Sequence, residues 1–233
     1  MSPTWEGSTA SSDADIISEI RKGRFGLPKK VAKVRDKWKL KSWVTVTASP
    51  SFGNAPIARV PLTDVEKPAG RVIETTLYDI LKQDPQHYAF KLFFQIDRVE
   101  GETAYTVFKG HEYSREFLRS LIRRGSSMSD FIKDYATKDG YVVRVYCTAL
   151  SQGKMNTSKK RDLRLSMDKV IGEKAAGMNY EGFVQELVLQ KVASDVYNEA
   201  KKITHLRHVG VRKSKLIAKP EPRKVEQLAP LAA

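Results

Sequence analysis

Alternating apolar and polar residues predict several β-strands in the first part of the chain. The pattern runs through residues 43–48, 71–77, 88–99 and 103–109, where β-branched and aromatic side chains are frequent. Glu100-Gly101-Glu102 joins the last two segments as a hairpin, and Lys138-Asp139-Gly140 joins 131–137 to 141–150. The signal in 131–137 is the weakest, because the run SSMSDFIKDYA is also typical of the start of a helix.

Helical spacing of apolar residues appears between and after these strands. Ser114 is a candidate N-cap for a helix that buries Phe117, Leu118, Leu121 and Ile122. Thr157 or Ser158 begins a longer helix, which ends near Gly177 and has an apolar stripe of Leu163, Met167, Val170 and Ile171. Asn179 and Ser194 are candidate N-caps of two further helices.

The chain returns to an alternating pattern at 208–217. This late strand is predicted to place Val209, Val211 and Lys213 on one side and Arg212 and Ser214 on the other. Strands first and helices later, with hairpin connections, predict an α+β fold around an antiparallel sheet or a barrel-like core with packed helices.

The length of 233 residues fits one or two domains, and the absence of a dividing linker favours one. We predict a flexible, non-basic extension at 1–28, which includes a short helix beginning after Ser12. A basic arm at 29–42 follows, then a single α+β domain at 43–217. Residues 218–233 contain three prolines and are predicted to form a flexible tail.

The net charge of +14 is concentrated in two segments. Residues 29–41 have a net charge of +6 and residues 201–224 one of +8, so the rest of the chain is balanced. Such segregation indicates a polyanionic partner. A solvated basic face is the alternative; an anionic membrane surface fits less well, because neither segment forms an amphipathic helix with an aromatic face.

Other features limit the compartment and the class of protein. No apolar run is long enough to cross a membrane, and the N-terminus lacks the pattern of a secretion signal. The single cysteine, Cys147, excludes an internal disulfide and is typical of a reducing compartment. We therefore expect a soluble intracellular protein, located in the cytoplasm.

The sequence has no recognisable catalytic or metal-binding motif. His205 and His208 are close in sequence but lack further zinc ligands, and Cys147 lies in a β-branched strand where a buried structural thiol is the default. Gly153-Lys154 lacks the rest of a phosphate-binding loop. We therefore predict no catalytic residue, no metal and no cofactor.

The basic positions predict contacts with RNA phosphates, and aromatic residues among them offer surfaces for base stacking. Each of the two tryptophans could instead anchor the arm to the core; we assign Trp43 to the core and Trp38 to RNA. Cations at 159–161 oppose the dipole of the predicted helix, so the fold alone disfavours them. A phosphate bound there would make the arrangement favourable, because it would contact both the cations and the free backbone N–H groups. The predicted RNA-binding residues are Lys29, Lys30, Lys33, Arg35, Lys37, Trp38, Lys39, Lys41, Arg123, Arg124, Lys159, Lys160, Arg161, Arg207, Arg212, Lys213 and Lys215.

Several segments occur in the order found in a known family. They are KVRDKWKLKSW, RVIETTLYDI, KLFFQIDRVEG, AYTVFKGHEYSREFLRSLIRR, TKDGYVVRVYC and LRHVGVRKSKLI, between Lys33 and Ile217. The chain thereby resembles the archaeal–eukaryotic S-three-A-e (e-S-one) family of small-subunit ribosomal proteins, and is closer to its archaeal branch. Residues 1–28 depart from the family pattern, because archaeal relatives generally begin with a short basic leader.

The resemblance implies a structural, ribosome-bound protein on the platform of the small subunit, near the messenger RNA exit. Its implied partners are small-subunit rRNA and neighbouring platform proteins, with messenger RNA near the exit as a further candidate and no membrane. Lys33–Trp43 would be the arm embedded in rRNA, with further contacts from Arg123-Arg124 and from the strand that contains Arg212, Lys213 and Lys215. The alternatives are a chromatin-type DNA binder, which needs a base-reading helix, and an RNA-modifying enzyme, which needs a cofactor loop or paired catalytic groups.

Overall fold

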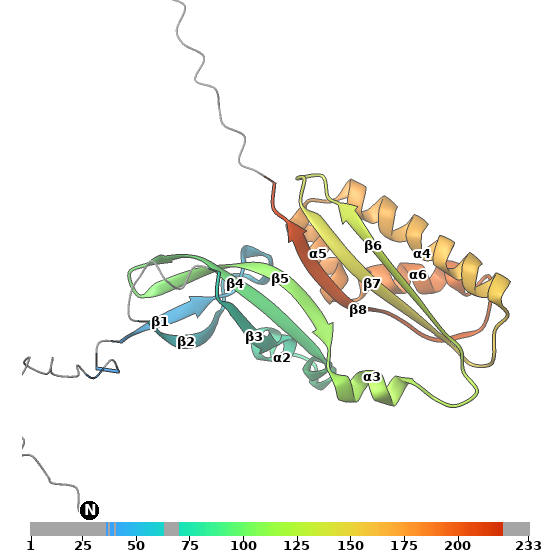
Figure 1. The fold of residues 1–233 in the computed structure, drawn as a ribbon, viewed down its shortest axis with the longest axis horizontal. Helices are drawn as coiled ribbons and strands as arrows, with labels where there is room; N and C mark the ends of the chain where they lie inside the picture. The colour runs from blue at the N-terminus through green and yellow to red at the C-terminus, as the bar shows by residue number, and fades with distance from the viewer. Residues whose placement is uncertain (1–35, 37, 40, 63–69, 221–233) are drawn as a thin grey trace, which may run out of the picture. The chain divides into compact units, whose positions relative to one another are not determined.

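The computed structural model describes residues 36, 38, 39, 41–62 and 70–220. Its helices and strands all belong to the compact unit that begins at Lys41, and they confirm the α+β class (Figure 1). The elements are β1 (Ser42–Thr47), β2 (Pro56–Leu62), β3 (Val72–Thr76), α2 (Leu77–Leu81), β4 (Phe90–Glu100), β5 (Thr103–Tyr113), α3 (Arg115–Leu121), β6 (Met128–Ala136), β7 (Val142–Ser151), α4 (Thr157–Gly177), α5 (Tyr180–Val188), α6 (Lys191–Ala200) and β8 (Leu206–Ala218). Two 3-10 turns, η1 (Pro50–Phe52) and η2 (Pro85–Ala89), precede β2 and β4.

The eight strands of the described ranges form one open sheet, in which β5 pairs with three other strands. One edge of β5 pairs with β4, and the other pairs with β1 at Thr103 and Ala104 and with β8 at Gly110–Glu112. The sheet is mixed rather than purely antiparallel, because the β1–β5 pair is parallel. Both predicted hairpins, β4–β5 and β6–β7, are confirmed; their turns place Gly101 and Gly140 at φ values of 58° and 80°.

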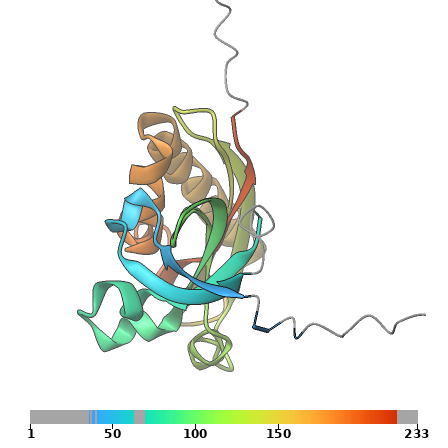
Figure 2. The same ribbon diagram turned by 90° about the vertical axis from the view of Figure 1, so that its left-hand side faces the viewer.

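The first five strands curl around a small apolar cluster (Figure 2). Its fully buried members are Val44, Val46, Leu62, Ile96 and Ala104. The sequence pattern did not predict β2, which contains Pro56 and Pro61. Proline is tolerated there because β2 is the terminal strand of the sheet order, where not every backbone N–H needs a partner.

Helices α4, α5 and α6 cover one face of β6, β7 and β8 (Figure 1). The predicted α4 stripe is confirmed at Leu163, Met167 and Ile171, which are fully buried, while Val170 is half-buried. Cys147 lies in this core, and burial raises the pKa of its thiol to about 12. The thiol is therefore a structural group, as the sequence indicated.

The two parts of the sheet join at a short seam between β5 and β8. His111 pairs with Ser214: its backbone N–H donates to Ser214 Oγ (3.2 Å), while Ser214 Oγ and the ring Nδ1 lie 2.7 Å apart. The ring Nε2 is 3.1 Å from the carbonyl oxygen of Val211. A Cβ atom at Gly110 would lie 2.1 Å from the carbonyl oxygen of Ser214, so the strands approach this closely only because residue 110 is glycine.

Four sequence expectations about local structure are wrong. Trp43 is 60% exposed, because alternation along β1 turns Val44 and Val46 inward and leaves Trp43 outside. Ile122 is exposed beyond the end of α3. Ser194 lies within α6, whose N-cap is Gln190 in the left-handed conformation.

The fourth wrong expectation concerns which residues of β8 share a face of the sheet. Tyr146 pairs with Lys213 and Cys147 with Val211, so Arg212 is the extra residue of a β-bulge. The bulge moves Ser214 to the buried side that Val209 and Val211 occupy, and Lys213 does not share that side.

Parts of the predicted domain division lie outside the described residues. These parts are the extension at 1–28 with its short helix, most of the arm at 29–42, and the tail beyond Pro220. They stay predictions. None of the helices in the described ranges is long and apolar enough to cross a membrane.

The His111 seam predicts a specific dependence of stability on pH. His111 is fully buried, and burial lowers its pKa from 6.5 to about 4, so the unfolded chain takes up a proton that the folded chain refuses. Its contribution is fully present above pH 6.5 and is lost as pH falls toward 4, a change of about 3 kcal/mol in the free energy of unfolding. Urea unfolding of the full chain and of its His111→Gln variant, repeated between pH 4 and pH 7.5, measures this contribution to the free energy of unfolding.

The free energies of the two proteins should differ most at pH 7.5 and converge toward pH 4, because Gln does not titrate. Carboxylate titration affects both proteins alike and cancels in the difference. A difference that stays constant with pH would contradict the assignment.

Candidate nucleic-acid interface

The structure brings two of the predicted basic segments to one end of the β6–β7–β8 sheet. The backbone N–H of Met155 donates to Ser127 Oγ (3.0 Å), and the N–H of Ser151 donates to the carbonyl oxygen of Ser127 (3.0 Å). These bonds hold the loop after α3 against the loop before α4. We call this surface the basic end; its cations are Arg123, Arg124, Lys154, Lys159, Lys160 and Arg161.

The cations of the basic end are available to an external anion. All of them are exposed except Lys160, which is half-buried. Within the described ranges, none of these cations takes part in an ion pair or donates a side-chain hydrogen bond. Like charges gathered without acidic partners repel one another, so the folded protein alone gains nothing from this grouping.

The first turn of α4 adds backbone donors to the same surface. Asn156 is its N-cap but makes no side-chain hydrogen bond to the turn, and the turn contains no acidic residue. By contrast, α2 is capped by Thr76 and Asp79, and α3 by Ser114 with Glu116 in its first turn. The first turn of α4 therefore combines unpaired N–H groups, the positive end of the helix dipole and three cations, which suits a phosphate group.

Three of the four predicted cations of β8 lie away from the basic end; the fourth, Arg207, lies at the start of the strand and is half-buried. Lys213 Nζ lies 2.9 Å from Glu112 Oε2, and Arg212 lies 3.8 Å from Asp130, so carboxylates already accompany both. Lys215 is exposed and has no ion pair with a described residue. The structure does not bring these three to the basic end, because they lie farther along β8, beside β5 and the middle of β7.

An ion pair between β6 and β7 likewise neutralises a cation on this sheet. Arg144 Nε and Asp134 Oδ1 lie 2.6 Å apart, and a second bond of 2.8 Å joins the same two side chains. Hydrogen bonding from Arg144 holds the pKa of Asp134 below its usual range. Apart from Lys215, the cations named on the middle of this sheet already have acidic partners, which leaves the basic end as the stronger site for an anion.

Trp43 provides an aromatic surface that the sequence interpretation had assigned to the core. It lies two residues after Lys41 on the outer face of β1, where its neighbour on β2 is Pro61. A hollow of about 400 Å³ beside it is lined by Thr45, Arg59 and Glu102, among others. An exposed indole next to cations suits stacking on an unpaired base.

The remaining predicted residues are only partly described. Trp38 is 59% exposed, and its backbone N–H donates to Asp36 Oδ1 (3.0 Å); Lys39 is also exposed. Lys29, Lys30, Lys33, Arg35 and Lys37 lie outside the described residues. Sequence reasoning missed Arg59 because it missed β2, and missed Lys154 because an isolated loop lysine carries no signal before its neighbours are known.

Comparison with known proteins identifies the family. The model of the Ribosomal S3Ae family matches residues 29–220. The chain belongs to this family. It is 45% identical over 191 residues to the small ribosomal subunit protein eS1 of Desulfurococcus amylolyticus, a match that covers 82% of this chain and 89% of that protein. The eS1 proteins of Sulfurisphaera tokodaii and Archaeoglobus fulgidus are each 40% identical, over 80% and 82% of this chain and 96% and 92% of theirs.

Membership of the S3Ae family confirms the resemblance seen in the sequence. The protein is a structural, non-enzymatic component of the small ribosomal subunit and takes part in translation together with rRNA and other proteins. The family decides against both alternatives, the chromatin-type DNA binder and the RNA-modifying enzyme.

The first turn of α4 yields a prediction that separates binding from folding. Changing Lys159, Lys160 and Arg161 together to Gln removes cations that oppose the helix dipole, so the free energy of unfolding should stay constant or rise by up to about 1 kcal/mol. Affinity for small-subunit rRNA should fall, and the slope of log K against log salt should shrink by up to about three.

In a matched control, three other cations are changed together to Gln. They are Lys109, Lys138 and Lys169, which lie outside the basic end and form no ion pair with a described residue. Filter-binding titrations in a series of salt concentrations measure both variants. Equal loss of slope in the two variants would mean that only the total charge matters and that the basic end is no site.

Trp43 yields a second prediction for the S3Ae protein. Trp43→Ala should lower RNA affinity by roughly 5- to 150-fold, the range expected for one lost base stack. The melting temperature should change little, because the side chain is largely exposed. Trp43→Phe keeps an aromatic face and should retain most of the affinity. A lower melting temperature with unchanged RNA affinity would show that Trp43 is an anchor of the fold.

Proposed function

We propose that this protein binds small-subunit rRNA on the platform near the messenger RNA exit and supports assembly of the subunit there. The observation that carries the proposal is the basic end of a small-subunit ribosomal family member. Its cations form no ion pair with a described residue, and they lie beside a helix N-terminus whose N-cap, Asn156, makes no side-chain hydrogen bond. The position on the platform rests on the family resemblance in the sequence.

The contacts we propose are mainly with the RNA backbone. Lysine and arginine side chains at the basic end and in the arm at 29–42 neutralise phosphates and release counterions. Phosphate contacts fix position without reading sequence, which suits a structural component. Trp43 adds a stacking contact to an unpaired base.

The partners follow from this placement. We propose small-subunit rRNA as the main partner and neighbouring platform proteins as further ones, with messenger RNA near the exit as an additional contact. The mixed ion pairs on β7 and β8 suit a protein neighbour better than RNA, because acidic side chains beside Lys213 and Arg144 would repel phosphates.

The single cysteine allows the platform position to be tested directly. Because the Cys147 thiol is buried, a cysteine introduced at exposed Ser158 in the first turn of α4 takes an iron chelate selectively. Hydroxyl radicals from Ser158→Cys in assembled subunits should cleave rRNA of the platform. A chelate at Glu173→Cys, about 22 Å further along α4, should cleave a different and weaker set of nucleotides. Cleavage confined to another region of the subunit would overturn the position.

The arm at 29–42 yields a prediction of its own. Changing Lys33, Arg35, Lys37 and Lys39 together to Ser should leave the melting temperature nearly unchanged, weaken binding to rRNA and reduce the salt slope by up to about four. Sedimentation of lysates on gradients should show wild-type protein with small subunits and a larger free fraction of the variant. Absence of the wild-type protein from small subunits would contradict the proposed function. An unchanged salt slope in the variant would show that the arm does not contact rRNA.

A further inference from the structure

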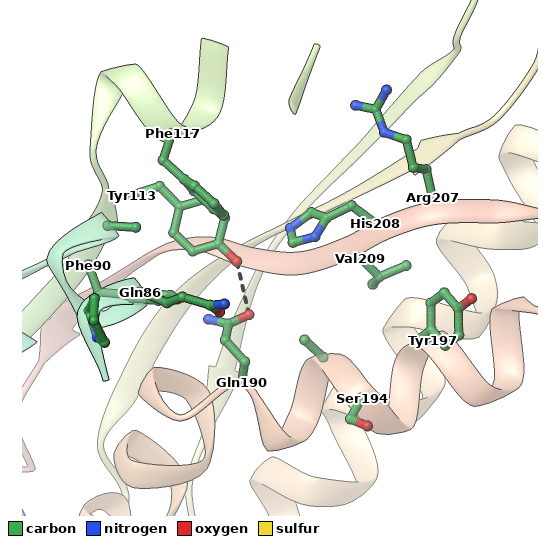
Figure 3. Close-up of a pocket in the computed structure, with 13 residues that line it drawn as sticks. Gln86, Phe90, Tyr113, Phe117, Gln190, Ser194, Tyr197, Arg207, His208 and Val209 are labelled. Atoms are coloured by element: carbon green, nitrogen blue, oxygen red, sulfur yellow. Dashed lines mark hydrogen bonds between the residues drawn. The ribbon is translucent and has the colours of Figure 1, made fainter. Parts of the chain in front are cut away.

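A cavity of about 580 Å³ lies where η2, α3, α6 and the first residues of β8 meet. It belongs neither to the basic end nor to the surface around Trp43. Its volume falls within the range of small-molecule sites. Figure 3 shows its lining, in which aromatic side chains from β4, β5, α3 and α6 surround a space that polar groups also enter.

Three aromatic rings form one wall of the cavity. Tyr113 packs edge-to-face against both Phe90 and Phe117, with ring centroids 5.2 Å apart in each pair. Its hydroxyl donates to Gln190 Oε1 (3.0 Å), which also accepts from the N–H of Val211 (3.0 Å). The wall is therefore held in place by the sheet and by α6 before any ligand arrives.

His208 presents hydrogen-bonding groups that the protein does not use. Its Nε2 is buried without a partner, and no bond between described residues engages either ring nitrogen. The ring lies edge-on to Phe117, with centroids 6.1 Å apart. Burial, and next the charge of Arg207, lower the pKa of His208, so the neutral ring carries one donor and one acceptor.

The charge of the lining has one sign. Arg207 is its single cation, and no carboxylate is among the described residues that line the cavity. Arg207 forms no ion pair with another residue in the described ranges. In Figure 3 its guanidinium group points away from the space between Tyr113 and Gln190, so it lies outside the ring-lined part.

We propose that this cavity takes one unpaired nucleotide of small-subunit rRNA, with the base against Phe117 and Tyr113 and the phosphate at Arg207. The base edge supplies the hydrogen-bond partner that Nε2 of His208 lacks, and the aromatic wall supplies the stacking surface on which unpaired bases are bound. The inference rests on the proposed function and adds to it a site that holds a single extruded base.

A protein side chain is the competing occupant. An apolar side chain would fill the ring-lined space but leave Nε2 of His208 unsatisfied and Arg207 without an anion. An acidic side chain would reach Arg207 but not use the aromatic wall. A nucleotide meets both requirements at once, because its apolar face and its charge are parts of one residue.

The test uses small subunits assembled with the full-length protein or its variants, and chemical probing of every unpaired rRNA base. Phe117→Leu removes the ring, Arg207→Gln removes the charge, and Ser194→Trp fills the cavity from an exposed position on α6 without removing a core side chain. Tyr88→Ala is the matched control, since Tyr88 is 55% exposed, stacks on Tyr78 and does not line the cavity.

All three variants should raise the reactivity of the same nucleotide several-fold over wild type, and Tyr88→Ala should leave it unchanged. Binding of an rRNA fragment that contains this nucleotide should weaken by roughly 5- to 150-fold in Phe117→Leu. Variants that sediment with subunits but change no base would overturn the nucleotide site. A crosslink from the cavity to a ribosomal protein would also overturn it. Wild-type protein missing from subunits would instead refute the proposed function.

Discussion

The short seam between β5 and β8 is the contact on which the arrangement of the described fold depends. It consists of three paired positions, Gly110–Glu112 with Lys213–Lys215, yet through it the curled strands and the helix-covered strands become one sheet. The His111 ring satisfies Ser214 and the backbone of Val211 together, so a polar residue sits in the core at little cost. Tyr180 reinforces the junction, because its hydroxyl donates to the carbonyl oxygen of Phe108 (2.6 Å).

The seam also determines where charge is satisfied and where it is not. Near it, Lys213 meets Glu112, and on the adjacent strands Arg144 meets Asp134. At the far end of β6 and β7, two loops and the first turn of α4 bring cations together without acids. The protein therefore separates a surface on which Lys213 and Arg144 already have acidic partners from one whose cations need an external anion, and the second gains more from a complex with RNA.

Local periodicity was sufficient to predict most of the secondary structure. The two hairpins, the buried stripe of α4 and the N-cap at Ser114 each depend on residues close in sequence, and each is confirmed. The failures depend on distant contacts. Pro56 and Pro61 suit β2 only because that strand is terminal in the sheet, and the bulge at Arg212 is defined by its partner strand. The assignment of Trp43 to the core was wrong, since the alternation along β1 places Trp43 on the face opposite Val44.

The candidate site was predictable in composition but not in arrangement. Charge alone selected Arg123, Arg124 and the cations at 159–161, yet nothing in the sequence showed that Ser127 would hold their loops together. The aromatic cavity was not predicted, since its lining residues extend from Pro85 to Val209 and so come from segments far apart in the sequence. Sequence pattern predicts which residues are exposed more reliably than which exposed residues meet.

The position of β8 has a consequence for the order in which the fold can form. It is the last strand among the described residues but lies between β5 and β7, so each of these strands keeps an open edge until residues 206–218 have been synthesised. Open strand edges are templates for wrong pairing between chains. A nascent chain of this protein therefore passes through a stage in which both parts of its sheet are incomplete, and insertion of a single C-terminal strand closes them together.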